Sequence, residues 1–222
     1  MTTLIFVRHG QSTANLDHIF AGYTDAPLTE LGHRQAEMTA AYLDSYPIDR
    51  IYASDLTRAY QTAEHTAAHR NMPIIAEPLF REIYAGEWEG MTFEAIAEKY
   101  PESHEIWKKA LYRAHPEGGE SVVQLSDRIA EGVRKVLEKH RGETVAIFTH
   151  ATPIRTLGWR WRGCDIHTID ETLLDMEKRV NFCPNASVSI AEYEDDGSFR
   201  LICYGYGEHL KEFSTELPKN LV

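Results

Sequence analysis

Short apolar runs that alternate with helical patterns constrain the fold of this chain more than any other feature. Buried strands are predicted at residues 4–7, 50–53, 73–76 and 144–149. Apolar side chains recur at helical spacing after Thr29, which can cap a helix, and again after Asp55. Strands that alternate with helices favour a parallel sheet covered by helices on its faces.

The second half of the chain extends this pattern. Ser121 begins a long amphipathic helix, and Pro153 suits the first turn of a helix that runs to about residue 161. One more helix is expected within residues 163–184, although the pattern there is mixed. Residues 186–193 and 199–204 alternate apolar and polar side chains on either side of a turn, which predicts a C-terminal hairpin.

Two stretches depart from the alternation. Residues 10–28 lack periodicity and are predicted to form a loop, and residues 77–120 are rich in Gly and Pro, with two short helices expected around 92–100 and 102–113. We predict one α/β domain over residues 1–222: a three-layer sandwich with a mostly parallel central sheet, an antiparallel C-terminal hairpin strand, and residues 77–120 inserted as a cap.

Composition excludes several classes of partner. The formal net charge of −11 disfavours nucleic acid and anionic membrane, while a local basic pocket for a small phosphorylated metabolite stays possible. No signal peptide and no membrane-length apolar run is found, and the three cysteines lack metal-ligand spacing. A soluble, cytoplasmic domain is therefore expected. Whether it is a monomer or a homodimer is left open.

Two predicted strands end in histidine. His9 follows the first strand and His150 follows the strand at residues 144–149, so both imidazoles lie at one sheet edge if these strands are neighbours. Arg8 precedes His9, and Arg58 lies in the first turn of a helix directed towards the same edge. Arginine suits phosphate, and neutral imidazole can carry a phosphoryl group. Solvated arginines and a histidine satisfied by backbone are the ordinary alternative.

Several motifs make the pattern more specific, and together they run from residue 4 to about 210. The chain resembles the histidine phosphatase superfamily, which has the phosphoglycerate-mutase-like fold. The resemblance is carried by Arg8-His9-Gly10-Gln11-Ser12 with Asn15, Leu28-Thr29-Glu30-Leu31-Gly32 with Gln35-Ala36, Ser54-x-Leu56-x-Arg58-Ala59-x-Gln61-Thr62-Ala63, residues 82–90, Gly119-Glu120-Ser121, Thr149-His150 and Asn185-Ala186-Ser187.

The resemblance implies a division of labour among these residues. His9 would attack phosphorus and become a phosphohistidine, which water then hydrolyses. Stabilisation of the phosphoryl oxygens would come from Arg8, Arg58 and His150, with the side chain of Asn15 and the backbone N–H of Ala151 as neutral donors. Permanent arginine cations make a metal or cofactor unnecessary in this scheme.

Glu82 matches the position of the family's proton donor. A carboxyl group is protonated near neutral pH when it is partly buried beside a phosphate dianion. Glu87 and Glu89 are alternative donors, more simply explained as structural or solvated acids. One branch of the family takes its donor from an Asp directly after the second His, where this chain has Ala151. Many members have Gly there, and Ala keeps the N–H donor.

The resemblance also separates possible activities. Mutases of the family usually follow the acid with a His-Tyr-Gly-Gly-Leu type of segment, whereas residues 83–90 here are Ile-Tyr-Ala-Gly-Glu-Trp-Glu-Gly. That segment resembles the phosphatase branch, so hydrolysis of a small phosphomonoester is predicted. The alternatives are a cofactor-dependent phosphoglycerate mutase and a non-catalytic protein that binds a phosphorylated ligand.

Three further features have weaker functional interpretations. His65 and His69 have the spacing of a metal pair on a helix, but surface histidines are the simpler prediction. The tryptophans are expected in the core, with Trp88 the best candidate for the substrate pocket. A distal anionic group of the substrate could be bound by Arg113, Arg155, Arg160 or Arg162, each of which is otherwise a solvated charge. The four tryptophans are Trp88, Trp107, Trp159 and Trp161.

Overall fold

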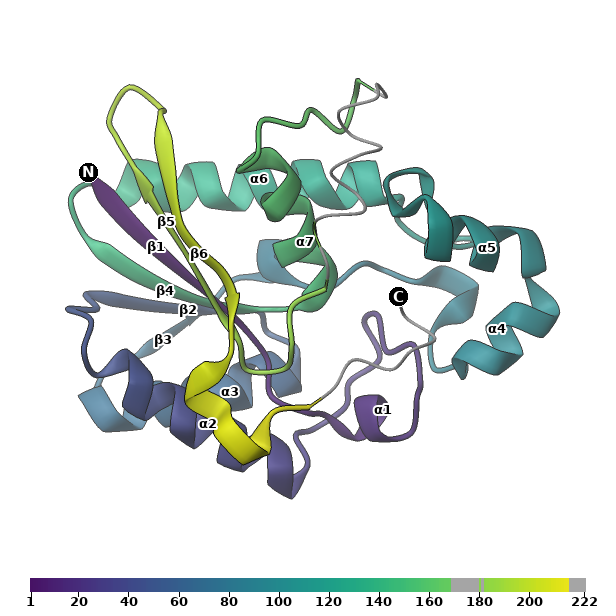
Figure 1. The fold of residues 1–222 in the computed structure, drawn as a ribbon, viewed down its shortest axis with the longest axis horizontal. Coiled ribbons are helices and arrows are strands. Elements are labelled where there is room, and N and C mark those ends of the chain that lie inside the picture. Colours follow the sequence, from purple (N-terminus) through teal and green to yellow (C-terminus); the bar gives the residue numbers. More distant parts are fainter. Residues whose placement is uncertain (169–179, 181, 216–222) are drawn as a thin grey trace.

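A six-stranded mixed sheet forms the centre of the computed structural model, which describes residues 1–168, 180 and 182–215 (Figure 1). The strands are β1 (Thr2–Arg8), β2 (Arg50–Ala53), β3 (Ile74–Ala76), β4 (Thr144–Thr149), β5 (Val188–Tyr193) and β6 (Phe199–Tyr206). Their order is β3-β2-β4-β1-β5-β6, and β5 runs antiparallel to both of its neighbours. The other pairs are parallel. The predicted mostly parallel sheet with an antiparallel hairpin strand is confirmed.

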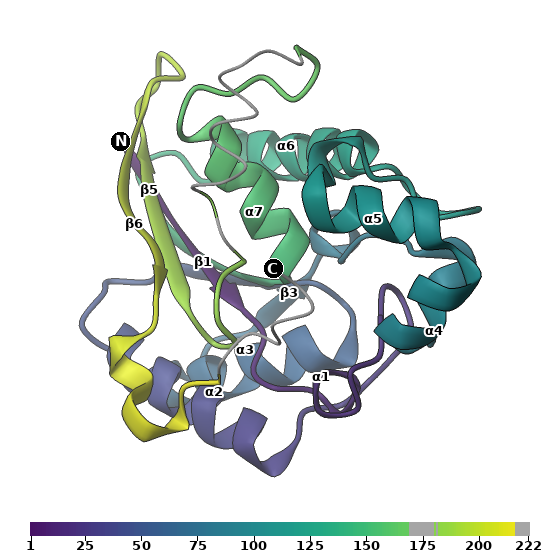
Figure 2. The same cartoon turned by 45° about the vertical axis from the view of Figure 1, so that its right-hand side comes forward.

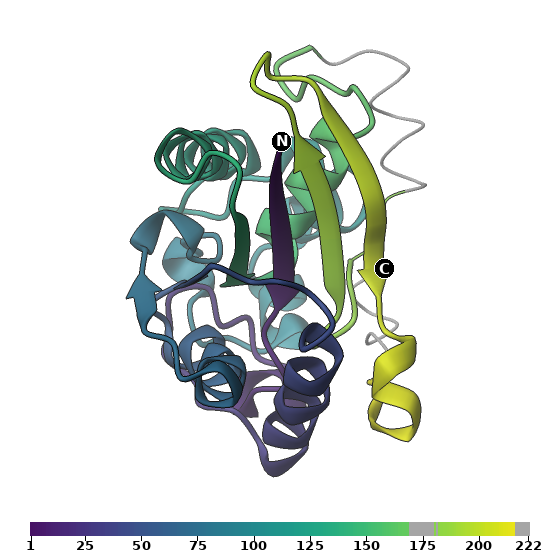
Figure 3. The ribbon, with the colours of Figure 1, turned by 90° about the vertical axis from the view of Figure 1, so that its left-hand side faces the viewer.

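Helices cover both faces of the sheet. On one face lie α2 (Glu30–Leu43) and α3 (Thr57–Arg70), and on the other lie α6 (Val122–Lys139) and α7 (Ala151–Arg160), as Figures 1 and 3 show. The side chain of Thr29 accepts a hydrogen bond from the N–H of Gly32 and so caps α2, as expected. Three layers result, which confirms the predicted sandwich.

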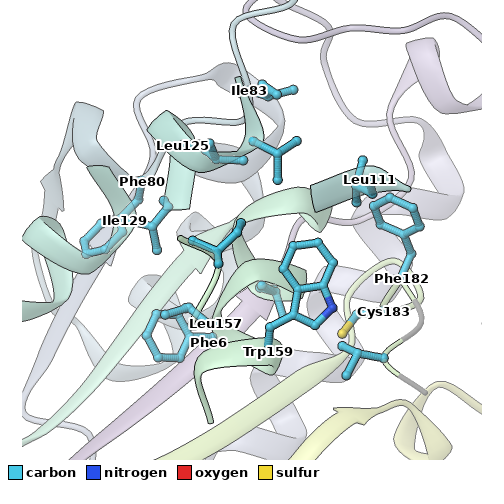
Figure 4. Packing of buried hydrophobic residues seen from close by; sticks show 14 of the residues in the cluster. Phe6, Phe80, Ile83, Leu111, Leu125, Ile129, Leu157, Trp159, Phe182 and Cys183 are labelled. Atoms are coloured by element: carbon cyan, nitrogen blue, oxygen red, sulfur yellow. The ribbon is translucent and has the colours of Figure 1, made fainter. Parts of the chain in front are cut away.

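Side-chain alternation in β1 joins the three layers. Leu4 and Phe6 pack into the apolar cluster beneath α6 and α7, part of which Figure 4 shows, whereas Ile5 and Val7 pack into the cluster beneath α2 and α3. All four side chains are fully buried. Each contributes about 1.5–3 kcal/mol by leaving water, so β1 is a rigid support for the residues that follow it.

The segment predicted as a cap contains five short helices. They are η1 (Pro78–Phe80), η2 (Gly86–Trp88), α4 (Phe93–Lys99), α5 (Pro101–Lys109) and η3 (Leu111–Arg113). Figures 1 and 2 show α4 and α5 beside each other at the end of the molecule towards which β1 points.

Two sequence expectations need comment. The loop predicted at residues 10–28 contains a one-turn helix, α1 (Thr13–Leu16), which is too short to produce a periodic pattern and is closed by a capping box between Ser12 and Asn15. The helix expected within residues 163–184 falls mostly outside the described residues. After β6 the chain continues into η4 (Glu208–Phe213). No helix in the described ranges is long and apolar enough to cross a lipid bilayer.

Candidate active site

Two neighbouring parallel strands bring His9 and His150 together. Arg8 at the end of β1 is in register with Thr149 at the end of β4, so the residue after each strand projects at the same edge. The two imidazole rings lie 5.1 Å apart between centroids and are nearly completely buried. His9 lines a cleft that opens to solvent and measures about 590 Å³ with the solvent space at its mouth included, whereas His150 lies beside His9 outside the described lining. Arg8, Asn15, Arg58, Glu82 and Ala151 line the same cleft.

Hydrogen bonding sets the tautomer of His9. Its Nδ1 lies 2.7 Å from the carbonyl oxygen of Gly10, so Nδ1–H donates there and Nε2 carries the lone pair. Burial, followed by the charges of Arg58 and Arg8, holds the pKa of His9 well below its ordinary value. His9 is therefore a neutral imidazole with a nucleophilic nitrogen at neutral pH.

Close backbone packing holds the turn that presents His9. A Cβ on Gly10 would lie 2.5 Å from the carbonyl oxygen of Gly32 at the start of α2, so glycine is required for this approach. The N–H of Gly10 donates to the Thr62 hydroxyl on α3, and the N–H of Gln11 donates to the side chain of Gln35 on α2. The turn is thus anchored to both helices of one layer.

The two arginines are buried cations held by carbonyl groups. Arg8 donates to the carbonyl of Cys183 at 2.5 Å, and Arg58 donates to the carbonyls of Gly22 at 2.7 Å and Thr24 at 3.1 Å. Burial lowers the pKa of Arg8, and it lowers the pKa of Arg58 to about 10, so both remain charged at neutral pH. Buried positive charge beside a cleft favours an anionic ligand.

The start of α7 lines the cleft through Ala151 and Thr152, and His150 directly precedes them. His150 Nε2 lies 2.8 Å from the hydroxyl of Ser54, and burial followed by the charge of Arg58 keeps the pKa of His150 well below its usual value. Ala151 is the first residue of α7, so its N–H is one of the free donors at a helix N-terminus, a natural position for an anion.

The remaining polar groups come from loops. Asn15 accepts hydrogen bonds through Oδ1 from the N–H of Ser12 and from Nδ2 of Asn185, which leaves its own Nδ2 as the donor suited to a ligand. Glu82 accepts hydrogen bonds from the N–H groups of Ile83 at 3.0 Å and Thr152 at 3.4 Å. A half-buried carboxyl group therefore lies in the same cleft as His9.

The two alternative acids occupy structural positions. Glu89 accepts four hydrogen bonds, from the N–H groups of Tyr23, Thr24 and Ala85 and from the Thr24 hydroxyl. It therefore organises the loop whose carbonyls hold Arg58. Glu87 is exposed and pairs with Lys99 at the end of α4 and with Tyr100 between α4 and α5. Neither acid lines the cleft.

The tryptophan expectation is corrected. Trp88 is fully buried, donates from Nε1 to Glu117 at 2.6 Å and does not line the cleft. Trp107 on α5 lines it instead. Trp159 and Trp161 are core residues, as expected.

The four arginines considered for a distal anion lie outside the described lining of the cleft. Arg113 is exposed, and Arg160 pairs with Ser126 and Asp127. Arg162 donates to the carbonyl of Gly158 and packs on the ring of Tyr204. Arg155 lies over the rings of Phe182 and Trp159.

His65 and His69 belong to a polar cluster between α2 and α3. Both contact the carboxylate of Glu37 at 2.9 Å, and His65 also lies 3.2 Å from His33. These partners come from α2 and could not be identified from spacing along α3. Among the described residues, no group of three or more His, Cys, Asp or Glu side chains is arranged to hold a metal ion.

Fold and site together define an α/β protein with paired histidines and buried arginines at the carboxyl ends of two adjacent parallel strands. The family model described as histidine phosphatase superfamily (branch 1) matches residues 4–205. The chain belongs to this superfamily, as the sequence motifs indicated.

Individual relatives extend the comparison. The chain is 32% identical to phosphoserine phosphatase 1 of Hydrogenobacter thermophilus over 99% of both chains. It is 33% identical to 2,3-bisphosphoglycerate-dependent phosphoglycerate mutase 2 of Gloeobacter violaceus, over 71% of this chain and 74% of that one. The solved structure of YhfR from Bacillus stearothermophilus superposes with a TM-score of 0.86 at 30% identity, covering 95% of this chain and all of the other. Some of these relatives are thus named as phosphatases and others as mutases.

Proposed function

We propose that this protein hydrolyses a small phosphomonoester through a phosphohistidine on His9, without a metal or cofactor. The observation that carries the proposal is the state of His9: a neutral imidazole with Nε2 unprotonated, buried beside two arginine cations in a cleft open to solvent. The superfamily membership and the phosphatase name of a relative matched along the whole chain support the same reaction.

The first half-reaction transfers the phosphoryl group. His9 Nε2 forms a bond to phosphorus as the bond between phosphorus and the ester oxygen breaks, and the carboxyl group of Glu82 gives its proton to the departing oxygen. Arg8, Arg58 and the N-terminus of α7 stabilise the charge on the phosphoryl oxygens.

The second half-reaction releases phosphate. The carboxylate of Glu82 takes a proton from water, the water oxygen bonds to phosphorus, and the bond from phosphorus to His9 Nε2 breaks. His9 returns to its starting form. Because arginine fixes its charge without a metal ion, these residues supply the positive charge that phosphoryl transfer requires.

A mutase is the second candidate, because one relative carries that name. A mutase must keep water from the phosphoenzyme and return the phosphoryl group to a second hydroxyl. Residues 83–90 differ from the segment usual in mutases, which favours hydrolysis. Bisphosphoglycerate-dependent conversion of 3-phosphoglycerate into 2-phosphoglycerate, faster than phosphate release, would replace the phosphatase proposal.

Phosphate release from a panel of monoesters in the presence of EDTA tests the proposal. Wild type should release phosphate at the same rate with and without EDTA, and His9→Ala should fall to background. His65→Ala, a histidine outside the cleft, is the matched control and should retain the wild-type rate. Loss of activity in EDTA contradicts the metal-free mechanism. Phosphate binding without turnover by wild type would indicate a binding protein.

A further inference from the structure

The cleft has a second, apolar part that the transfer chemistry does not use. We call it the apolar wall, and its members come from the loop between α1 and α2, from α4 and α5, and from the segment before β5. It consists of Ile19, Phe20, Ala21, Phe93, Trp107 and Phe182.

Aromatic contacts preorganise this wall. The ring of Phe20 lies 4.9 Å from that of Trp107 and 5.6 Å from that of Phe93, between centroids. Phe20, Trp107 and Phe182 are buried with only 4–8% of their surface exposed, so each presents a small fixed area to the cleft. Such a surface binds an apolar group without first having to be ordered.

Backbone hydrogen bonds hold the wall in place. The N–H of Phe20 donates to the carbonyl of Met91 at 2.8 Å, and the N–H of Phe93 donates to the carbonyl of His18 at 3.2 Å. The loop between α1 and α2 is therefore tied directly to the start of α4. A ligand that fills this space contacts a surface fixed by two segments distant in the sequence.

Charge distinguishes the wall from the rest of the cleft. Within the described lining, Arg8 and Arg58 are the cationic side chains, and both are needed for the phosphoryl group. Glu82 is the acid, and it is needed at the ester oxygen. A carboxylate or an ammonium on the leaving group would lose water against the apolar wall, which is unfavourable because the described lining holds no further opposite charge. The guanidinium of Arg155 lies over the ring of Phe182 but does not line the cleft.

We propose that the physiological substrate is a phosphomonoester whose leaving group is uncharged and apolar, preferably carrying an aromatic ring. This assignment rests on the proposed phosphatase function. It adds that the apolar wall selects the alcohol, whereas His9, the two arginines and Glu82 act on the phosphoryl group and the ester oxygen.

A matched pair of esters tests the assignment. Benzyl phosphate and 4-carboxybenzyl phosphate share the same reacting oxygen and differ by a charge remote from it, and O-phosphoserine adds a small doubly charged alcohol. The kcat/KM for benzyl phosphate should exceed that for each charged ester by about 10- to 100-fold, because one or two factors of ten correspond to about 1.4–2.8 kcal/mol of unfavourable desolvation.

Variants connect this preference to the wall. Phe93→Lys places a cation on α4 at the cleft and should lower the ratio of kcat/KM for benzyl phosphate over 4-carboxybenzyl phosphate by at least about tenfold. Phe199→Ala, an aromatic residue on β6 with 41% of its surface exposed, should leave the ratio unchanged. A ratio is informative even where a substitution reduces the folded fraction, because both esters sample the same folded protein.

The outcomes separate the two proposals. If the charged esters are hydrolysed as well as benzyl phosphate, or better, the leaving-group assignment is overturned and the phosphatase proposal stands. A ratio unchanged by Phe93→Lys also overturns the assignment to this wall. If wild type hydrolyses none of the three esters or any other member of the panel, the phosphatase proposal itself fails.

Discussion

Arg128 is expected to control proton donation without touching the substrate. Its guanidinium donates five hydrogen bonds: two to the carboxylate of Glu120, and one each to the carbonyls of Leu79, Arg81 and Glu82. The side chains of Arg128 and Glu120 are only 16% and 15% exposed. This one side chain on α6 therefore fixes the backbone that carries the proposed acid.

The stability cost of Arg128→Met follows from this burial. Removing one partner of a nearly buried ion pair costs about 3–5 kcal/mol, because Glu120 is left unpaired. The melting temperature should fall by roughly 10 °C in a chain of this size. The double variant Arg128→Met/Glu120→Gln removes the unpaired charge and should recover most of that loss, while the backbone at Glu82 remains without its support.

Catalysis should respond differently from stability. A positioned general acid contributes about 10²- to 10⁴-fold, so partial misplacement of Glu82 should lower kcat/KM for benzyl phosphate by about 10- to 100-fold in both variants. For 4-nitrophenyl phosphate, whose leaving group departs without a proton, the loss in kcat/KM should be no more than about threefold, because kcat/KM reports the transfer to His9 and not the later attack of water. Steady-state kinetics below the melting transition measure both. Equal losses for the two esters, or full catalytic recovery in the double variant, would refute the positioning role.

Three further outcomes are expected. Gly10→Ala places a Cβ 2.5 Å from the carbonyl oxygen of Gly32 and should lower the unfolding free energy by about 1–3 kcal/mol in urea titrations, and an unchanged midpoint would contradict this. Glu89→Gln removes acceptors from the loop that holds Arg58 and should raise KM by about tenfold, and an unchanged KM would show that the loop does not depend on the carboxylate. Burial and then the charge of Arg58 depress the pKa of His9, so its neutral, nucleophilic form becomes protonated only well below about pH 6.5. After correction for the ionisation of the phosphate ester, the fall of kcat/KM at acid pH should therefore lie below that pH. An acid limb at or above it would contradict a buried, neutral nucleophile.

Much of the fold, and the positions of most polar residues in the candidate site, were predictable from local sequence patterns. Residues 4–7 and 144–149 each combine a buried strand with a following His, and parallel neighbours end at the same sheet edge. Their adjacency was not predictable from periodicity, because β4 lies between β1 and β2 although it comes after both in the chain.

The positions of side chains within residues 77–120 were harder to predict. Trp88 is close to Glu82 in sequence, but the 3-10 turn η2 directs it into the core, while Trp107 reaches the cleft from α5. The short distance in sequence between Trp88 and Glu82 therefore gave a wrong expectation for the cleft. The supporting roles of Ser54 and Thr62 could not be predicted from the motif in which both lie. Ser54 contacts His150 after β4, and Thr62 accepts a hydrogen bond from Gly10 after β1, so both partners come from distant parts of the chain.

Trapping the phosphoenzyme tests the central claim most directly. Wild type mixed with a ³²P-labelled monoester and quenched within one turnover should carry label that is stable in base, labile in acid and located on the peptide containing His9. The label should be absent from His9→Ala and present in His65→Ala. Phosphate release by wild type with no labelled His9, or hydrolysis that persists in His9→Ala, would contradict the phosphohistidine mechanism.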